Sequence, residues 1–249
     1  MTVARSFGTT PVAAWEGRFP WLRAGTTRRT RTADSRAAAV GSSAPGEKPD
    51  GVDLALASGW RAVVRSRQVH GRSIQVHGRL PRGVCVTGEG DGHATDASGL
   101  LLTVTLADCV PVFIVDPARR TVALLHAGWR GTAAGVVEAG LETLSGALGS
   151  DPEELLVHLG PAICGRCYEV GPEVFHALGQ VAPHAPAAID LRSVIRCRAI
   201  AAGVRERCVT VSDECTLCGD GRYYSHRGGD RGRHRGYIGI RESDDLRTG

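Results

Sequence analysis

The most regular pattern of apolar residues lies in the middle of the chain. Residues 100–106 form an almost uninterrupted apolar run that ends just before Cys109, and residues 112–115 continue it. A third apolar run, 121–125, ends at His126. Runs without polar alternation are typical of strands that are covered on both faces. The pattern therefore predicts neighbouring buried strands that carry a thiol and an imidazole at their ends.

Apolar residues at helical spacing follow this region. They predict helices over 132–148, from Pro172 onward, and over 191–203. Further strands are predicted within 60–76, and over 155–159, 208–211 and 237–240, with loops over 25–52, 88–99 and 219–236. This mixture predicts an α/β or α+β fold in a single domain, 1–249, with an irregular N-terminal part (1–58) and a core over 60–240.

Composition narrows the class of protein. A hydrophobic fraction of 42% in 249 residues is enough for a substantial core, while a net charge of +4 is too small to indicate nucleic-acid binding. The first residues lack the apolar segment of a signal peptide, and no apolar stretch approaches the ~20 residues of a membrane span. We therefore expect a cytoplasmic protein without a membrane or nucleic-acid partner, whose eight cysteines are reduced.

Three residues of metal-binding type end separate predicted strands: His70, Cys109 and His126. Two imidazoles and one thiolate form a zinc-like ligand set, and three ligands leave the fourth tetrahedral position for water or substrate. The spacing alone leaves a second interpretation open. In that interpretation the three are buried side chains that bond to the backbone.

Several segments together resemble one known family. They are RQVHG at 67–71, LADCVPV at 106–112, HAGWRGTAAGVV at 126–137, GPAICGRCYEVGPEV at 160–174 and the C-terminal CTLCGDGRYYSHRGGDRGRHRGYIGI. In this order they resemble the YfiH/YlmD-type family, also called laccase-domain or multicopper polyphenol oxidoreductase proteins, purine nucleoside phosphorylases, or peptidoglycan editing factors. Near 91–99 the chain departs from the family pattern.

The resemblance implies a layered sandwich of mixed sheets flanked by helices. It implies that His70, Cys109 and His126 hold Zn²⁺, with copper as the less favoured metal. It also implies phosphorolysis of adenosine, inosine, guanosine or methylthioadenosine, and deamination of adenosine. The expected partners are a purine nucleoside and phosphate, and the expected assembly is a monomer or homodimer.

Residues near the ligand set supply candidates for catalysis and substrate binding. Arg130 lies near the start of the helix after His126, where it could bind phosphate. Asp108 could transfer a proton or cap a turn. The other substrate-binding candidates are Arg28, Arg227 and Arg233, each with a surface charge as the alternative, and the further candidates are Glu89, Glu169, His93 and Trp129.

Two CxxC pairs occur, Cys164–Cys167 and Cys215–Cys218. Paired CxxC motifs can bind structural zinc. The pairs are farther apart along the chain than in a usual zinc ribbon, which favours reduced or opportunistically paired thiols over a second metal.

Three other functions stay open. A copper phenol oxidase is disfavoured, because laccase chemistry needs several coppers and the chain has nine scattered histidines. A hydrolase that edits misincorporated peptidoglycan precursors could use the same zinc ion. A structural zinc module without catalysis is the third.

Overall fold

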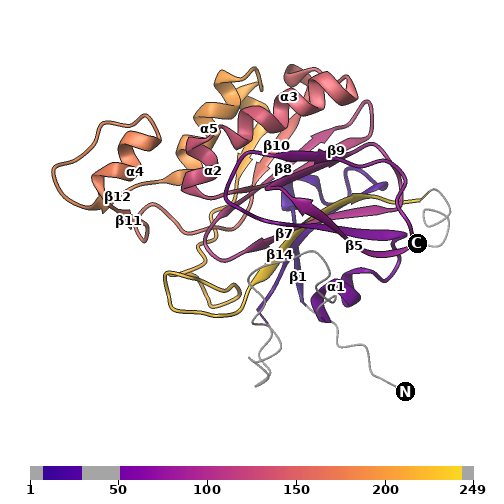
Figure 1. Ribbon diagram of the computed structural model, residues 1–249, viewed down its shortest axis with the longest axis horizontal. Coiled ribbons are helices and arrows are strands. Elements are labelled where there is room, and N and C mark those ends of the chain that lie inside the picture. Colours follow the sequence, from indigo (N-terminus) through magenta and orange to yellow (C-terminus); the bar gives the residue numbers. More distant parts are fainter. Residues whose placement is uncertain (1–7, 30–50, 243–249) are drawn as a thin grey trace.

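Two stacked six-stranded sheets form the centre of this computed structural model, which describes residues 8–29 and 51–242 (Figure 1). The first sheet contains, in order, β1 (Thr9–Pro11), β2 (Leu22–Thr27), β14 (His234–Ile240), β7 (Leu100–Leu106), β3 (Ala62–Arg67) and β5 (Gly83–Glu89). The second contains β13 (Val209–Val211), β10 (Leu156–Leu159), β8 (Val110–Asp116), β9 (Thr121–Ala127), β6 (Gly92–Thr95) and β4 (Ile74–Val76). Both sheets mix parallel and antiparallel pairs.

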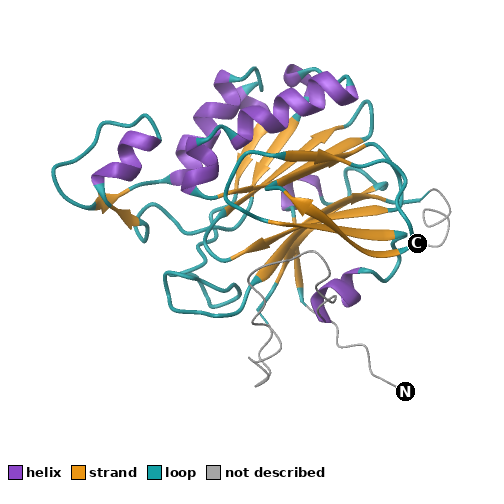
Figure 2. Cartoon of the chain, viewed as in Figure 1, coloured by secondary structure: helices purple, strands orange, loops and turns teal. Residues whose placement is uncertain are grey.

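Two longer helices, α3 (Val136–Leu148) and α5 (Leu191–Ala201), cover the outer face of the second sheet (Figure 2). The shorter helices are α1 (Gly51–Leu56), α2 (Trp129–Ala133), α4 (Pro172–Ala177), η1 (Ala13–Trp15), η2 (Pro152–Glu154) and η3 (Glu206–Cys208). A small ribbon, β11 (Glu169–Val170) with β12 (Ala187–Ala188), projects from the sandwich together with α4 (Figure 1). None of the described helices is long and apolar enough to cross a membrane.

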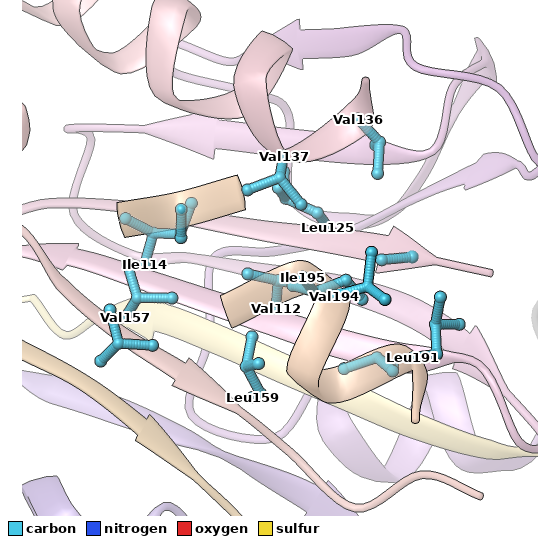
Figure 3. Close-up of a cluster of buried hydrophobic side chains, with 14 of the residues drawn as sticks. Val112, Ile114, Leu125, Val136, Val137, Val157, Leu159, Leu191, Val194 and Ile195 are labelled. Carbon is cyan, nitrogen blue, oxygen red and sulfur yellow. The ribbon is translucent and has the colours of Figure 1, made fainter. Parts of the chain in front are cut away.

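The central strand β8 explains how one sheet supports two cores. Val112 and Ile114 pack toward the helices, where they meet Val137 and Ile195 (Figure 3). The alternate residue Phe113 belongs to the cluster between the two sheets. Successive strand residues point to opposite faces, so a strand that is covered twice must be apolar throughout. All seven residues of β8 are buried, which agrees with the uninterrupted apolar pattern.

The fold class is confirmed as a layered α+β sandwich of mixed sheets flanked by helices. Three local predictions were wrong. The helix expected over 132–148 is broken at Gly135, whose φ of 87° lies in the left-handed region that favours glycine. The loop expected over 88–99 contains β6, and the irregular N-terminal part contains β1, η1, β2 and α1. Residues 30–50 of the loop expected over 25–52 lie outside the described residues.

Candidate metal centre

The β8–β9 hairpin brings Cys109 and His126 to the same end of the second sheet. The strands are antiparallel, with Pro111 opposite His126 and Val110 opposite Ala127. Cys109 immediately precedes β8, so the hairpin register places it beside the segment that begins at Gly128. The two ligand types are far apart in sequence only because the hairpin lies between them.

His70 comes from the other sheet. It lies three residues beyond the end of β3, with a φ of 57°, which is uncommon for a residue other than glycine. Its ring lies edge-on to that of His126, with 4.8 Å between the ring centroids. One ligand atom each from His70, Cys109 and His126 lies within 4.8 Å of the others. His126 is buried and His70 is exposed, so the group opens to solvent on the side of His70.

Asp91 fixes both histidines, although the sequence analysis did not identify it. Its Oδ1 accepts hydrogen bonds from Nδ1 of His126 and from the backbone N–H of His70, each at 2.9 Å. Its Oδ2 accepts from the backbone N–H groups of Val69 and Gly71 at 3.1 and 2.8 Å. A carboxylate that accepts from Nδ1 leaves Nε2 with its lone pair, and this is the usual way to orient a metal-binding histidine.

The unexpected strand β6 explains the position of Asp91. Gly92 pairs with Leu125, and the backbone N–H of His126 donates to the carbonyl oxygen of Asp91 at 2.7 Å. The aspartate is fully buried. Burial would raise the pKa of its carboxyl, but the hydrogen bonds from His126 and from the backbone of Gly71 and Val69 lower that pKa below its usual value. Asp91 is therefore ionised.

The Cys109 thiol and the His126 ring change each other's protonation. Burial alone would raise the pKa of Cys109, but the charge of His126 and hydrogen bonds from His126 and His70 lower it to about 6. Burial alone would lower the pKa of His126, but Cys109 and Asp91 raise it to about 9. Without a metal, the two shifts favour a thiolate–imidazolium pair at neutral pH. A metal ion would bind the Cys109 thiolate and displace the proton on Nε2 of His126.

Two glycines make room for the three ligands. A Cβ atom at residue 128 would lie 2.9 Å from Sγ of Cys109 and 3.2 Å from Cδ2 of His70. A Cβ atom at residue 131 would lie 2.9 Å from the carbonyl oxygen of Gly71. Helix α2 can approach the His70 turn this closely because both positions are glycine. The donor types, the orienting carboxylate and this close packing all fit a bound metal ion.

Asp108 connects the cluster to two loops. Its side chain accepts hydrogen bonds from Oγ1 of Thr216 at 2.6 Å and from the backbone N–H of Arg227 at 2.7 Å. Its carbonyl oxygen accepts from the backbone N–H of Ile163 at 3.1 Å. Each carboxylate oxygen thus accepts from a loop, an arrangement that suits positioning of the segment before Cys109.

Tyr168 is a second residue that the sequence analysis did not assign to the site. Burial raises the pKa of its hydroxyl to about 12, Cys109 and Asp108 add to the increase, and Arg227 and Arg130 oppose it. The guanidinium of Arg227 lies over the Tyr168 ring, 5.3 Å from its centroid, and donates to the carbonyl oxygen of Glu169 at 2.8 Å.

The structure places the other candidates as follows. Arg130 is exposed, and its guanidinium lies 4.3 Å from the ring centroid of Trp129. Arg233 donates to carbonyl oxygens of its own loop, at Asp230, Arg231 and Gly232. Arg28 is exposed and donates to Oγ1 of Thr10 at 3.0 Å.

The remaining candidates have mainly local contacts. Glu89 forms an ion pair with Arg67. Glu169 is exposed in β11. His93 is fully buried and shares a hydrogen bond of 2.9 Å with His77.

The fold and the cluster define a candidate metalloprotein of the layered α+β class. A family model described as multi-copper polyphenol oxidoreductase laccase matches residues 52–241. The chain therefore belongs to this family, which is the one that the sequence segments resemble.

Similar proteins are named for two different activities on nucleosides. The chain is 36% identical over 195 residues to purine nucleoside phosphorylase YlmD of Geobacillus stearothermophilus, covering 70% of this chain and 71% of the relative. It is 34% identical over 148 residues to adenosine deaminase RL5 of an unknown prokaryotic organism, covering 55% and 56%. The crystal structure of YlmD from Geobacillus stearothermophilus matches with a TM-score of 0.75 at 30% identity, covering 90% of this chain and 94% of that one.

Proposed function

We propose that this protein is a zinc-dependent purine nucleoside phosphorylase that also deaminates adenosine. The main supporting observation is the cluster of His70, Cys109 and His126, with Asp91 oriented to hold both histidines. The names of the relatives support the substrate class. The proposed substrates are adenosine, inosine, guanosine and methylthioadenosine, with phosphate as the second substrate.

In this proposal His70, Cys109 and His126 hold the zinc ion. Three protein ligands are typical of catalytic sites, because the fourth position is left for water or substrate. When bound, zinc would supply Lewis-acid activation of water or of a substrate oxygen at neutral pH. Asp91 keeps Nδ1 of His126 protonated and the His70 turn in place, and Asp108 holds the segment that carries Cys109.

Phosphorolysis requires that a phosphate oxygen bonds to C1′ of the ribose while the bond from C1′ to the purine nitrogen breaks. The leaving base then takes up a proton. We assign phosphate binding to the positive charges of Arg130 and Arg227, since both guanidinium groups lower the pKa of the Tyr168 hydroxyl, which the Cys109 thiol raises. Tyr168 stays protonated at neutral pH, so its hydroxyl can donate a hydrogen bond to phosphate or ribose. Arg28 and Arg233 are proposed as further substrate-binding residues.

A cytoplasmic location belongs to the same proposal, because thiolate ligands persist in a reducing compartment.

The proposal is tested with purified protein, each of the four nucleosides and phosphate. We expect free base and the sugar 1-phosphate by chromatography, and inosine from adenosine when phosphate is omitted. Cys109→Ser should abolish both reactions, whereas Cys197→Ser, at an exposed cysteine of α5, should retain them. Wild-type protein that contains zinc but forms no product from any of these nucleosides would refute the proposal.

The description of the family model favours polyphenol oxidation as a second candidate. Among the described residues, one group of potential metal ligands contains histidine, whereas laccase chemistry uses several copper sites rich in histidine. Copper at several equivalents per chain, with oxidation of a phenol by the wild type and not by Cys109→Ser, would support this alternative. A third candidate, editing of peptidoglycan precursors, is tested by offering a UDP-linked muramoyl-serine to the same preparation.

A further inference from the structure

The four cysteines of the two CxxC pairs lie together and form a group separate from the histidine-containing cluster. The sulfur atoms all lie within 4.8 Å of one another; they belong to Cys164, Cys167, Cys215 and Cys218. None of the four forms a disulfide. The sequence analysis favoured reduced or opportunistically paired thiols over a second metal, because the pairs are far apart along the chain.

Strand pairing brings the two pairs together. β10 and β13 are parallel neighbours, with Leu159 opposite Val211, so the chain leaves both strands at the same end of the sheet. The segments after these strands stay adjacent, because Ala162 and Cys215 form a parallel bridge. The backbone N–H of Thr216 also donates to the carbonyl oxygen of Ala162 at 3.1 Å.

Backbone hydrogen bonds hold the two CxxC segments so that their sulfur atoms lie close together. Sγ of Cys215 accepts hydrogen bonds from the backbone N–H groups of Cys164, Leu217 and Cys218, at 3.3, 3.4 and 3.4 Å. Three such donors hold this buried sulfur in one position, as hydrogen bonds to metal ligands do. In the other pair, the backbone N–H of Cys167 donates to the carbonyl oxygen of Cys164 at 3.0 Å, which folds this CxxC segment into a tight turn.

The spacing of the sulfur atoms suits tetrahedral coordination. Sγ of Cys164 and Sγ of Cys218 are 3.8 Å apart. A zinc–sulfur distance of about 2.3 Å in a regular tetrahedron gives sulfur–sulfur distances of about 3.8 Å. The bond of a disulfide is much shorter, at about 2.0 Å.

We propose that Cys164, Cys167, Cys215 and Cys218 bind a structural zinc ion that is distinct from the ion assigned to the histidine-containing cluster. Four protein ligands complete a tetrahedral site and leave no position for substrate, as in structural zinc sites. The proposal stands independently of the proposed enzymatic function, because it rests on different residues.

This zinc ion links the two loops that border the candidate metal centre. Thr216, inside the second CxxC segment, donates to Asp108 beside Cys109. Tyr168 directly follows Cys167, and its ring lies under Arg227. The four-cysteine zinc site therefore fixes the positions of Asp108, Tyr168 and Arg227 relative to the candidate metal centre.

The first test is elemental analysis of purified protein after dialysis against a weak chelator. The expected content is two zinc ions per wild-type chain, and one after the paired substitution Cys164→Ser with Cys218→Ser. The matched control, Cys85→Ser with Cys197→Ser, removes two cysteines outside the cluster and should keep both ions. If only the four-cysteine site binds zinc, the wild type will hold one ion and the Cys164/Cys218 variant none. That result would support the four-cysteine zinc site and contradict zinc binding by the histidine-containing cluster.

The second test keeps all four cysteines, so it does not depend on a folded cluster variant. Cobalt replaces zinc in Cys109→Ser, which removes the thiolate of the other site. Strong near-ultraviolet absorption from cobalt–thiolate bonds is expected. Its absence in folded protein would overturn the proposal, as would a zinc content that the Cys164/Cys218 substitution leaves unchanged. A freshly purified wild-type chain that contains a disulfide among these cysteines, seen by mass spectrometry, would also overturn it.

Discussion

Oδ1 of Asp91 accepts a hydrogen bond from Nδ1 of His126 at 2.9 Å. The same carboxylate accepts from three successive backbone N–H groups around His70, so one buried side chain orients a ligand from each sheet. The left-handed backbone of His70 is held by these bonds, because an isolated turn would rarely adopt a φ of 57° at histidine.

We therefore expect Asp91→Asn to weaken metal binding about 10- to 100-fold, the usual effect of removing a carboxylate that orients a histidine ligand. An amide has one acceptor oxygen, so it cannot replace both carboxylate oxygens. Competition with a chelator of known affinity measures the change. Asp96→Asn is the matched control, because Asp96 is exposed and lies just beyond β6. Equal affinities for the two variants would contradict the role of Asp91.

Gly128→Ala should also weaken metal binding, by a steric route. The added Cβ would lie 2.9 Å from Sγ of Cys109, closer than ordinary contact, so the sulfur or helix α2 must move. The same competition experiment applies.

The control for this variant is Gly146→Ala in α3, where an added Cβ meets nothing within 4 Å. Because alanine favours a helix, this change should stabilise the protein by roughly 0.5–1 kcal/mol and leave metal affinity unchanged. If Gly128→Ala binds the metal as tightly as Gly146→Ala does, the close packing has no role in binding.

Arg130→Ala and Arg227→Ala should each raise the phosphate KM roughly tenfold, since a hydrogen bond to a charged group contributes about 1.5–3 kcal/mol. The nucleoside KM should change little. Steady-state kinetics at varied phosphate concentration provides the measurement, with the exposed Arg79→Ala as a control. An unchanged phosphate KM in both variants would remove these arginines from the phosphate site.

Stability should decrease in mild acid because of buried histidines. Burial lowers the pKa of His158 to about 4, whereas an unfolded histidine has a pKa of about 6.5. As the pH falls from about 6.5 toward 4, the unfolded chain takes up a proton that the folded chain excludes. Stability from this group is therefore complete above pH 6.5, and it is lost by about 1.4 kcal/mol per pH unit across that window.

His158→Asn removes this titration, so its urea midpoint should depend less on pH than that of the wild type. His93 and His234, whose pKa values burial lowers to about 3, keep the same direction of change in both proteins. Urea unfolding at pH 7.5 and pH 5 tests the difference. Parallel losses of stability in the two proteins would show that His158 does not carry the effect.

Local sequence patterns predicted several strands and helices of the sandwich. The apolar runs of β7, β8 and β9 predicted buried strands. The structure buries β8 and β9 between the first sheet and the helices, and β7 is almost entirely buried within the first sheet. Helix α5 was also predicted nearly to its ends, over 191–203, and the structure shows that the side chain of Asp190 caps its start. The break at Gly135 was missed, since the apolar spacing continues across it.

The candidate metal centre, too, was predicted in part from the sequence and recognised in part only from the structure. The residue types at 70, 109 and 126 indicated a ligand set, and the structure brings these three together. Asp91 was missed because its segment was read as a loop, and β6 is recognisable only from its pairing with β9. Tyr168 lay inside a recognised segment, but nothing local showed that the guanidinium of Arg227 lies over its ring.

Periodicity and residue type are local properties of the chain, and they were enough to predict the fold class, the buried strands and the chemical types of the ligands. Which distant residues meet depends on how the strands pair. The parallel pairing of β10 with β13 joins the two CxxC pairs, and the antiparallel pairing of β6 with β9 sets Asp91 against His126. Strand order and register depend on how whole layers pack, so the spacing of residues along the chain does not reveal them.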